Sequence, residues 1–315
     1  MNIKLEEVTK CPICTKNDCI DKYSKVYDYL NRDFQREYEL SSCRECRHSF
    51  LSKRPIEEEI YKFYEKHYYT HENKKKLFKL DYIKSSVLFL TKLPYKFIYS
   101  AFYSEIKNIS KGSILDVGCG NGEYILKMKK KGWETYGIET DPEALEICKR
   151  KIPNGNFSNQ KLNNFSFEGK KFDLIYMSHV LEHVYDPLKY LQICSNLLKK
   201  DGKVLIKVPN YGSLEQKIFG KYWRGFEPPR HINNFSFNSL KIIISKTDLK
   251  LIGLAPDPLP MCTLESLTAF LENFVPKFYI RYLQLPFYLL FYLINIFLGY
   301  FKIFNSMKVL ITKNV

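Results

Sequence analysis

Two acidic residues and the glycine-rich turn between them are the part of this sequence whose residue types and spacing suggest chemistry. Asp116 lies in a short apolar run, the turn at 118–122 reads Gly-Cys-Gly-Asn-Gly, and Glu139 ends the next apolar run. Glycines let the backbone bend sharply and let a ligand approach without interference from Cβ atoms. In doubly wound folds, an acid at the tip of the second strand accepts hydrogen bonds from ribose hydroxyls. The sequence therefore predicts a nucleoside site.

The residues around the turn narrow the identity of the ligand. A dinucleotide fingerprint requires Gly or Ala at the position of Glu123, and a phosphate-binding loop requires Lys followed by Ser or Thr; neither is present. The Glu123 carboxylate would also repel a pyrophosphate. Asp116 suits a ligand that carries an ammonium group, which the amino-acid end of S-adenosylmethionine supplies. Asp116 and Glu139 together match the two ends of that cofactor.

Further sequence blocks extend this interpretation to a family. The blocks are Leu115–Gly122, Gly137–Glu139, Phe172–Val184, Asp186–Pro187, Leu197–Lys199 and, after Gly202, Val208–Asn210. Through them the chain resembles the class I methyltransferases of the ubiquinone-biosynthesis-like kind, over roughly residues 110–255. The resemblance implies an α/β fold with a Rossmann-like seven-stranded sheet, and a cofactor at the carboxyl ends of its first strands.

The resemblance also implies adenine contacts within residues 159–165, where the usual acidic residue is absent. Asn163 or Leu162 is left for that role. The predicted cofactor-binding residues are Asp116, Gly118, Cys119, Gly120, Gly122, Glu139, Thr140, Asn163 and His179.

Three histidines are candidates for acid–base chemistry near the cofactor. Methyl transfer from a sulfonium is an in-line displacement, so a base is needed only when the acceptor must lose a proton, as a hydroxyl does. His179 and His183 follow the expected fourth strand, and His231 lies where the substrate-covering loop of the family falls. Loops at this edge hold substrates. We therefore take His231 and His183 as candidate catalytic residues and expect His179 to pack over the cofactor.

The N-terminus contains two C-x-x-C knuckles that predict a structural metal site. Cys11 with Cys14, and Cys43 with Cys46, can complete a tetrahedral zinc shell. A module of this size has too small a core to fold well alone, so the metal would supply much of its stability. Free thiols or a redox pair are the alternatives. Cys19 and His48 could replace a ligand, but we expect a turn residue and an exposed histidine.

These features divide the chain into consecutive parts. We expect a zinc-ribbon-like module at 1–54, a helical connector at 55–109, the methyltransferase core at 110–256, an apolar helical insertion at 257–305 and a final core strand at 306–315. The cysteine count of nine is odd and does not suggest a disulfide framework. Together with the lack of a signal-peptide-like apolar stretch at the N-terminus, this favours the cytoplasm.

The C-terminal insertion and the positive charge suggest a membrane partner. Residues 282–301 are 20 residues without Asp, Glu, Lys or Arg, but the final strand must return to the sheet, so a single crossing does not fit. A helical hairpin made with residues 264–274 would instead lie in the interface, where the net charge of +15 favours anionic lipid on the inner face of the cell membrane. A homodimer interface or a buried cap is the alternative.

The sequence thus predicts an S-adenosylmethionine-dependent methyltransferase that methylates the oxygen of a small-molecule, glycan or lipid-linked acceptor. An RNA methyltransferase is the first alternative, but the sequence contains no aromatic–basic RNA motif and no Asn/Asp-Pro-Pro-Tyr type motif. A non-catalytic scaffold with this fold is the second alternative. It is disfavoured because Asp116, the glycines and Glu139 are all present.

Overall fold

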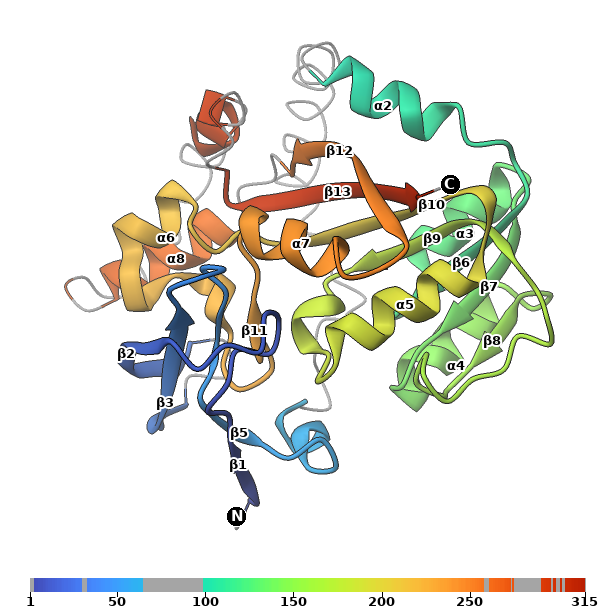
Figure 1. The fold of residues 1–315 in the computed structure, drawn as a ribbon. Helices are drawn as coiled ribbons and strands as arrows, with labels where there is room; N and C mark the ends of the chain where they lie inside the picture. The colour runs from blue at the N-terminus through green and yellow to red at the C-terminus, as the bar shows by residue number, and fades with distance from the viewer. Residues whose placement is uncertain are drawn as a thin grey trace.

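The computed structural model contains a central α/β core with a smaller β module beside it (Figure 1). It describes residues 3–29, 33–64, 99–257, 261–272, 274, 290–295, 297–298, 301 and 304–314. Most of the expected connector at 55–109 and most of 282–301 lie outside the described residues. The part of the connector that is described includes the 3-10 helix η1 (Ile60–Phe63) and the helix α2 (Ser100–Lys107).

The core contains the predicted seven-stranded sheet. Its strand order is β12 (Leu249–Pro256), β13 (Ser306–Lys313), β10 (Leu198–Pro209), β9 (Phe172–Ser178), β6 (Ser113–Val117), β7 (Glu134–Ile138) and β8 (Asn156–Ser158). Strands β8, β7, β6, β9 and β10 pair in parallel, and β13 runs antiparallel to both β10 and β12. The parallel strands end at one edge, where open α/β sheets bind ligands.

Alternate residues of the central strands pack against helices on the two faces of the sheet. Leu115 faces a cluster that includes Leu191 and Leu240, whereas Ile114 faces one that includes Phe102 and Met128. This alternation is the period of two that a strand imposes. The helices that carry these residues are α5 (Pro187–Leu197) and α7 (Phe237–Ile244) on one face, and α2 and α3 (Glu123–Lys130) on the other.

The turn after β6 depends on glycine at three positions. Gly118, Gly120 and Gly122 all have positive φ angles, of 70°, 53° and 78°, which side chains with a Cβ atom rarely adopt. A Cβ atom on Gly118 would also lie 2.6 Å from Cγ2 of Val180. Helix α3 begins at Glu123, directly after Gly122. The strand, glycine turn and helix predicted from the sequence are therefore present.

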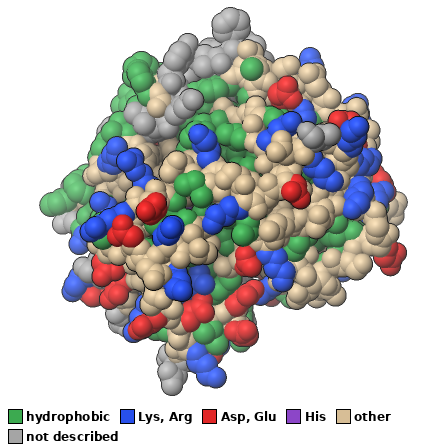
Figure 2. All heavy atoms as spheres, viewed as in Figure 1, with side chains coloured by type: hydrophobic (Ala, Val, Ile, Leu, Met, Phe, Trp, Pro, Cys, Tyr) green, Lys and Arg blue, Asp and Glu red, His purple; other side chains and the backbone are tan. Residues whose placement is uncertain are grey.

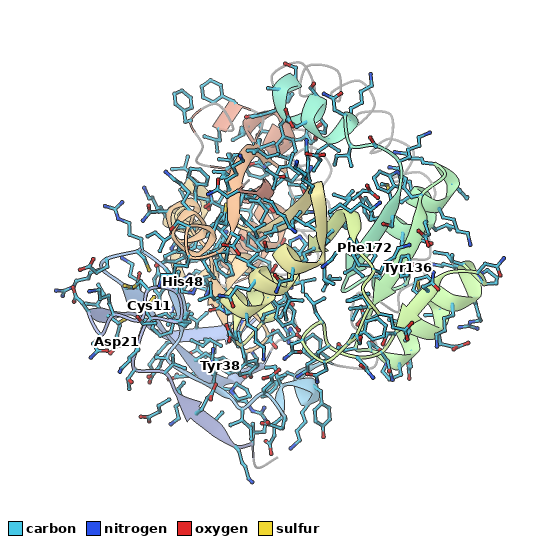
Figure 3. The ribbon with its side chains drawn as sticks, turned by 45° about the vertical axis from the view of Figure 1, so that its right-hand side comes forward. Cys11, Asp21, Tyr38, His48, Tyr136 and Phe172 are labelled. Atoms are coloured by element: carbon cyan, nitrogen blue, oxygen red, sulfur yellow. The ribbon has the colours of Figure 1, made fainter. Side chains whose placement is uncertain are left out.

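The N-terminal module is built from two small antiparallel sheets. One pairs β2 (Cys19–Asp28), β3 (Asp33–Cys43) and β4 (Ser49–Leu51), and the other pairs β1 (Leu5–Glu7) with β5 (Lys53–Pro55). The four labelled side chains of the module in Figure 3 lie apart from Tyr136 and Phe172, which belong to the core sheet. The short strand β11 (Asn233–Asn234) comes from the core but pairs with β4. The module is therefore joined to the core through a shared sheet.

The C-terminal insertion is anchored to the core by buried side-chain amides. Asn210, directly after β10, donates to the carbonyl oxygen of Phe304 at 2.7 Å, and within the insertion Asn305 donates to Thr263 Oγ1 at 3.1 Å. Thr263 belongs to helix α8 (Met261–Leu271). Within the described residues, we find no helix with the length and hydropathy that a membrane crossing requires.

We predict that Gly118→Ala lowers the free energy of unfolding by more than Gly132→Ala does. Both glycines have a positive φ, so both substitutions should incur roughly 1–2 kcal/mol of backbone strain. Nothing lies within 4 Å of a Cβ atom on Gly132 among the described residues, whereas on Gly118 the atom would clash with Val180 and add about 1–3 kcal/mol. Urea unfolding of both variants measures the difference, and equal losses of stability would contradict this account.

Candidate functional site

A single cavity of about 1260 Å³ lies at the carboxyl edge of the parallel strands and is lined by most of the predicted cofactor-binding and catalytic residues. The predicted cofactor-binding residues in its wall are Gly118, Glu139, Thr140, Asn163 and His179. Both candidate catalytic residues, His183 and His231, belong to the same wall. Leu162, the alternative adenine contact, also lines it. The topology thus brings together residues that are more than 100 positions apart in the chain.

Glu139 is held at the tip of β7 by the backbone of the glycine turn. Its Oε2 accepts a hydrogen bond from the Gly120 backbone N–H at 2.8 Å, and its Oε1 accepts one from the Asp141 backbone N–H at 2.9 Å. Burial raises the pKa of the carboxyl, and these two backbone N–H groups oppose the shift. A carboxylate has about four acceptor positions. Glu139 can therefore keep both contacts and still accept from ligand hydroxyls.

Asp116 lies deeper than the sequence suggested. Its side chain is 3% exposed, and it lies outside the residues that line the cavity, as do Cys119, Gly120 and Gly122. Burial, followed by the nearby Cys148 and Glu139, raises the pKa of its carboxyl well above the ordinary value. Of the glycine turn, Gly118 therefore reaches the cavity wall, whereas the carboxylate of Asp116 does not.

The candidate catalytic histidines contact each other. The rings of His183 and His231 pack edge to face with centroids 4.6 Å apart. His183 Nδ1 lies 3.0 Å from the Arg230 carbonyl oxygen, and His231 Nδ1 lies 2.7 Å from the Gly225 carbonyl oxygen. A carbonyl oxygen only accepts, so both Nδ1 atoms carry the hydrogen and each neutral ring has its lone pair on Nε2.

The surroundings keep both imidazoles neutral near pH 7. Burial, together with the neighbouring His231, lowers the pKa of His183 to about 4. Burial also lowers the pKa of His231, although Glu227 opposes that shift. Both Nε2 atoms are therefore unprotonated acceptors at neutral pH, which is the state that a general base requires.

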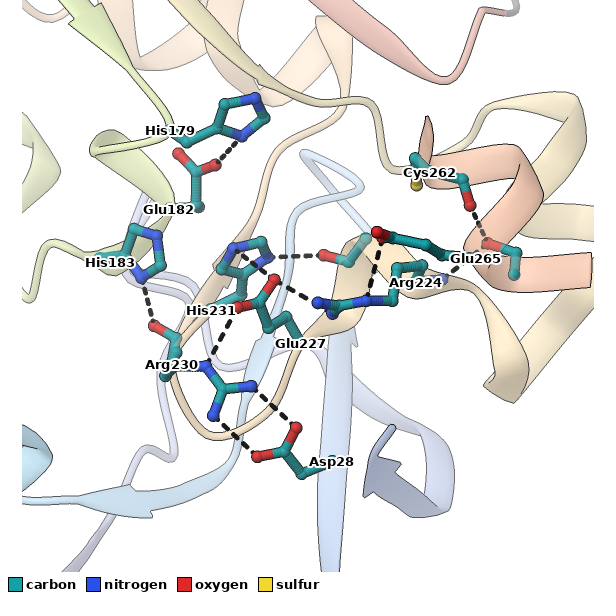
Figure 4. A network of polar contacts seen from close by, with 12 residues as sticks. Asp28, His179, Glu182, His183, Arg224, Glu227, Arg230, His231, Cys262 and Glu265 are labelled. Atoms are coloured by element: carbon teal, nitrogen blue, oxygen red, sulfur yellow. Dashed lines mark hydrogen bonds and ion pairs between the residues drawn. The ribbon is translucent and has the colours of Figure 1, made fainter. Parts of the chain in front are cut away.

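A buried ion-pair network surrounds these histidines (Figure 4). Glu227 Oε1 accepts from Arg230 Nε at 3.0 Å, and its Oε2 lies 3.0 Å from Arg224 Nη1 and 3.7 Å from His231 Nε2. Arg230 also forms two hydrogen bonds, of 2.7 and 2.8 Å, with Asp28 of the N-terminal module. Burial alone would raise the pKa of the Glu227 carboxyl, but Arg224, His231 and Arg230 hold it below its ordinary value.

His179 differs from the other two histidines in position and contacts. Its side chain is 43% exposed, and its Nδ1 lies 2.9 Å from Oε1 of the buried Glu182. Its φ angle of 56° is unusual for a residue with a Cβ atom and marks a sharp turn directly after β9. Glu182 Oε2 has no hydrogen-bond partner within the described part of the chain. We therefore treat His179 as a wall residue that Glu182 orients.

Several residues of the site were missed by the sequence interpretation. Tyr64, at the end of the described connector, lines the cavity and places its hydroxyl 3.1 Å from His183 Nδ1. Arg224, Glu227 and Glu265 also line the cavity. The alternation of basic and acidic residues in 224–231 was a usable signal for Arg224 and Glu227. Tyr64 and Glu265 lie in apolar or aromatic segments, where the sequence gives no such signal.

The four predicted metal ligands form one cluster in the N-terminal module. Their sulfur atoms all lie within 4.8 Å of one another, with Cys11–Cys46 and Cys14–Cys43 contacts of 3.4 Å. Zinc–sulfur bonds of 2.3 Å in a tetrahedron place sulfurs about 3.8 Å apart, so the donor set fits this ion. Each knuckle forms a turn of the same kind. The Thr15 N–H donates to the Cys11 carbonyl oxygen in one, and the Arg47 N–H donates to the Cys43 carbonyl oxygen in the other.

His48 is buried, which corrects the expectation of an exposed histidine. It is 0% exposed, and its Nε2 lies 3.0 Å from Asn233 Oδ1 in β11. Its ring also packs on Phe235 with centroids 5.0 Å apart. The expectation was wrong because the covering residues come from the core, 185 positions along the chain. Cys19 lies beside the cluster but outside the group of four sulfurs.

The sequence of the core is similar to those of known proteins. A family model described as a methyltransferase domain matches residues 95–254. A ubiquinone biosynthesis O-methyltransferase from Haemophilus ducreyi is 37% identical over 106 residues, covering 31% of this chain and 45% of that protein. The counterpart from Cereibacter sphaeroides is 30% identical over 116 residues, covering 35% and 47%. The matched part of the chain spans about half the length of these curated relatives.

Among solved structures, a SAM-dependent methyltransferase from Archaeoglobus fulgidus is similar to this chain with a TM-score of 0.45 and 20% identity, covering 71% of this chain and 99% of that one. A TehB-like SAM-dependent methyltransferase from Corynebacterium glutamicum gives a TM-score of 0.40 and 17% identity, covering 67% and 85%. Because the family model matches about half of the sequence, this chain belongs to the methyltransferase domain family.

Proposed function

We propose that the protein transfers a methyl group from S-adenosylmethionine to a hydroxyl oxygen of a small-molecule, glycan or lipid-linked acceptor. One observation carries the proposal: the cavity that Gly118 and Glu139 line at the glycine turn is also lined by His183 and His231. Donor and acceptor can therefore meet within one cavity. The name of the relatives, O-methyltransferase, supports oxygen as the acceptor atom.

In this proposal, the first two strands hold the cofactor. Glu139 accepts hydrogen bonds from the ribose hydroxyls, and Asn163 with Leu162 lines the adenine end. Asp116 is assigned to the ammonium end; burial raises the pKa of its carboxyl, and the positive charge of the bound cofactor would favour the ionised form. When bound, S-adenosylmethionine supplies the methyl group on a sulfonium, and the residues of the chain align the acceptor with it.

The acceptor would bind in the part of the cavity lined by Arg224, Glu227 and His231, because these groups form hydrogen bonds with hydroxyls. A sugar fits such a lining better than a bare aromatic ring does. S-adenosylmethionine would supply the methyl group to the acceptor oxygen and would leave as S-adenosylhomocysteine, its sulfur keeping the electron pair of the broken bond. His231 Nε2 receives the hydroxyl proton, and His183 supports the ring of His231 from its edge.

The decisive experiment incubates the protein with radiolabelled S-adenosylmethionine and an extract of its source organism that is then separated into lipid, glycan, RNA and protein fractions. We expect label in the lipid or glycan fraction.

Glu139→Ala should weaken S-adenosylhomocysteine binding in calorimetry at least tenfold, since hydrogen bonds to a charged group contribute roughly 1.5–3 kcal/mol. His231→Asn should leave that affinity within about twofold of the native value and slow transfer roughly 10²–10⁴-fold.

Label in the RNA fraction would contradict the acceptor class, because it would indicate an RNA methyltransferase. Native protein that fails to bind S-adenosylhomocysteine would support a non-catalytic scaffold instead. An unchanged affinity in Glu139→Ala would contradict the assignment of the cofactor half.

We further propose that the four-cysteine cluster binds a structural zinc ion. The cluster uses all four thiolates, so the ion would have no open position for chemistry. Cys11, Cys43 and Cys46 are each 1% exposed, and they belong to the same hydrophobic cluster as residues of the core sheet. Loss of the ion would therefore disturb packing well beyond the module.

We predict about one zinc ion per chain by atomic emission in native protein and in Cys19→Ser, and well below that in Cys43→Ser. Cys19 is the matched control because it is a cysteine of the same module that lies outside the cluster. Cys43→Ser should also lower the melting temperature, since bound zinc contributes to folding. Equal zinc contents in the two variants would contradict the assignment.

We also propose that the C-terminal insertion rests on an anionic membrane surface, on the cytoplasmic side. Hydrophobic side chains gather at the surface over this part of the molecule (Figure 2). The exposed apolar residues of the insertion are Phe270, Phe274, Leu290, Leu293, Ile294, Phe297 and Phe301. Aromatic and aliphatic side chains presented in this way can enter the headgroup region, and the net charge of +15 would favour anionic lipid.

We predict that the double variant Phe297→Ser, Phe301→Ser binds vesicles of phosphatidylglycerol and phosphatidylcholine at least tenfold more weakly than native protein. Fully burying one such side chain contributes roughly 1.5–3 kcal/mol, so two partial insertions suffice. Leu5→Ser is the control, because Leu5 is 49% exposed but lies in the N-terminal module. Unchanged vesicle binding, or a native dimer that the double variant dissociates, would contradict the membrane assignment.

A further inference from the structure

The loop that forms the acceptor part of the cavity is attached to the N-terminal module. Asn233 and Asn234 of β11 pair with Phe50 and Ser49 of β4, and Leu51 N–H donates to the Ile232 carbonyl oxygen at 3.1 Å. His231 directly precedes these residues. The module therefore extends its own sheet with the end of the loop that carries a candidate base.

A buried ion pair ties the same loop to a second strand of the module. Arg230 is 0% exposed and Asp28 at the end of β2 is 2% exposed. Arg230 Nη1 and Nη2 donate to the two carboxylate oxygens of Asp28 at 2.7 and 2.8 Å, across 202 residues of sequence. This two-pronged geometry fixes the plane and direction of the guanidinium as well as its distance.

The guanidinium and the backbone of Arg230 each contact the acceptor part of the site. Arg230 Nε donates to Glu227 Oε1 at 3.0 Å, and Glu227 lies against His231 and lines the cavity. The Arg230 carbonyl oxygen accepts from His183 Nδ1 at 3.0 Å. Asn233, held by His48 of the module, donates to the Val184 carbonyl oxygen at 2.7 Å beside His183. Contacts of the module therefore reach both histidines.

We propose that Asp28 of the N-terminal module is a positioning residue for methyl transfer, acting through Arg230 on Glu227, His183 and His231. Asp28 is not among the residues that line the cavity, so its effect would be on the orientation of groups that do. This inference rests on the proposed function, because it takes that part of the cavity as the acceptor site. It assigns the module a role in turnover that is separate from its contribution to folding.

The test compares Asp28→Asn with Glu37→Gln. Asn keeps the shape of Asp28 and removes its charge, whereas Glu37 is exposed on the neighbouring strand and pairs with Lys25, away from Arg230. Both variants should bind S-adenosylhomocysteine within about twofold of native protein in calorimetry. In Asp28→Asn, kcat/KM for the labelled acceptor fraction should fall at least about tenfold while KM for S-adenosylmethionine stays unchanged. Glu37→Gln should match native protein in both.

A spectroscopic readout tests the inference without an acceptor. In protein labelled with ¹⁵N-histidine, long-range ¹H–¹⁵N spectra report the Nδ1 and Nε2 shifts of His183 and His231, assigned with His183→Gln and His231→Gln. Asp28→Asn should move both sets of signals, and Glu37→Gln should move neither. Native shifts and native kcat/KM in Asp28→Asn would overturn the inference while leaving methyl transfer itself intact.

If Asp28→Asn does not fold, Asp28→Glu decides. This variant retains the charge but displaces the carboxylate by one methylene, so we expect the same signals to move by smaller amounts and kcat/KM to fall roughly three- to tenfold. Native values for Asp28→Glu in both measurements would overturn the inference. Failure of the proposed function is distinguishable, since then native protein itself transfers no label to an oxygen acceptor.

Discussion

A guanidinium buried between two carboxylates is the interaction on which the arrangement of this molecule depends. Arg230 has no exposed surface and lies against Asp28 from the module and Glu227 from its own loop. A charge in such a place is tolerated only when it is paired and hydrogen-bonded, and removal of one partner leaves an uncompensated charge. The end of β2 and the loop after β10 must therefore keep their positions relative to each other. The cysteine cluster helps to fix the position of β2, because Cys43 ends β3, the strand that pairs with β2.

The parts of the fold and site that could be predicted from the sequence are those encoded by neighbouring residues. The turn at 118–122 is specified by its own glycines, and Glu139 follows one strand later. Each C-x-x-C knuckle is likewise encoded by neighbouring residues. The expectation that one metal ion binds both knuckles was then enough to predict that the four sulfurs lie together. His183 and His231 were identified because each follows a parallel strand, and such strands end at one edge of the sheet. Topology alone then brings them to one cavity.

The rest could not be predicted because it depends on contacts between distant segments. The residues next to His48 in the sequence do not indicate that Asn233 will contact and cover it. Asp28 and Arg230 are separated by 202 residues, and neither spacing nor periodicity links them. Asp116 was assigned to the cofactor site from the motif, yet its burial behind the turn depends on the three-dimensional path of the glycine backbone. Local sequence predicts the residue types and the approximate ends of the strands. The burial of a side chain and its hydrogen-bond or ion-pair partners depend on how the whole chain packs.

The charged residues in the acceptor part of the cavity suit the movement of charge in the proposed reaction. The methyl donor is a cation, so a protonated imidazole beside it would be repelled, and burial that lowers the pKa values of His183 and His231 avoids this. In the proposed reaction, transfer would move the positive charge from the sulfonium to a proton on His231. Glu227, 3.7 Å from His231 Nε2, is placed to stabilise that new charge, while Arg224 and Arg230 keep Glu227 ionised. Glu227 can do this only while Arg230 keeps its direction. In the proposed reaction, the pair that joins the module to the core would therefore also determine where the proton can be accepted.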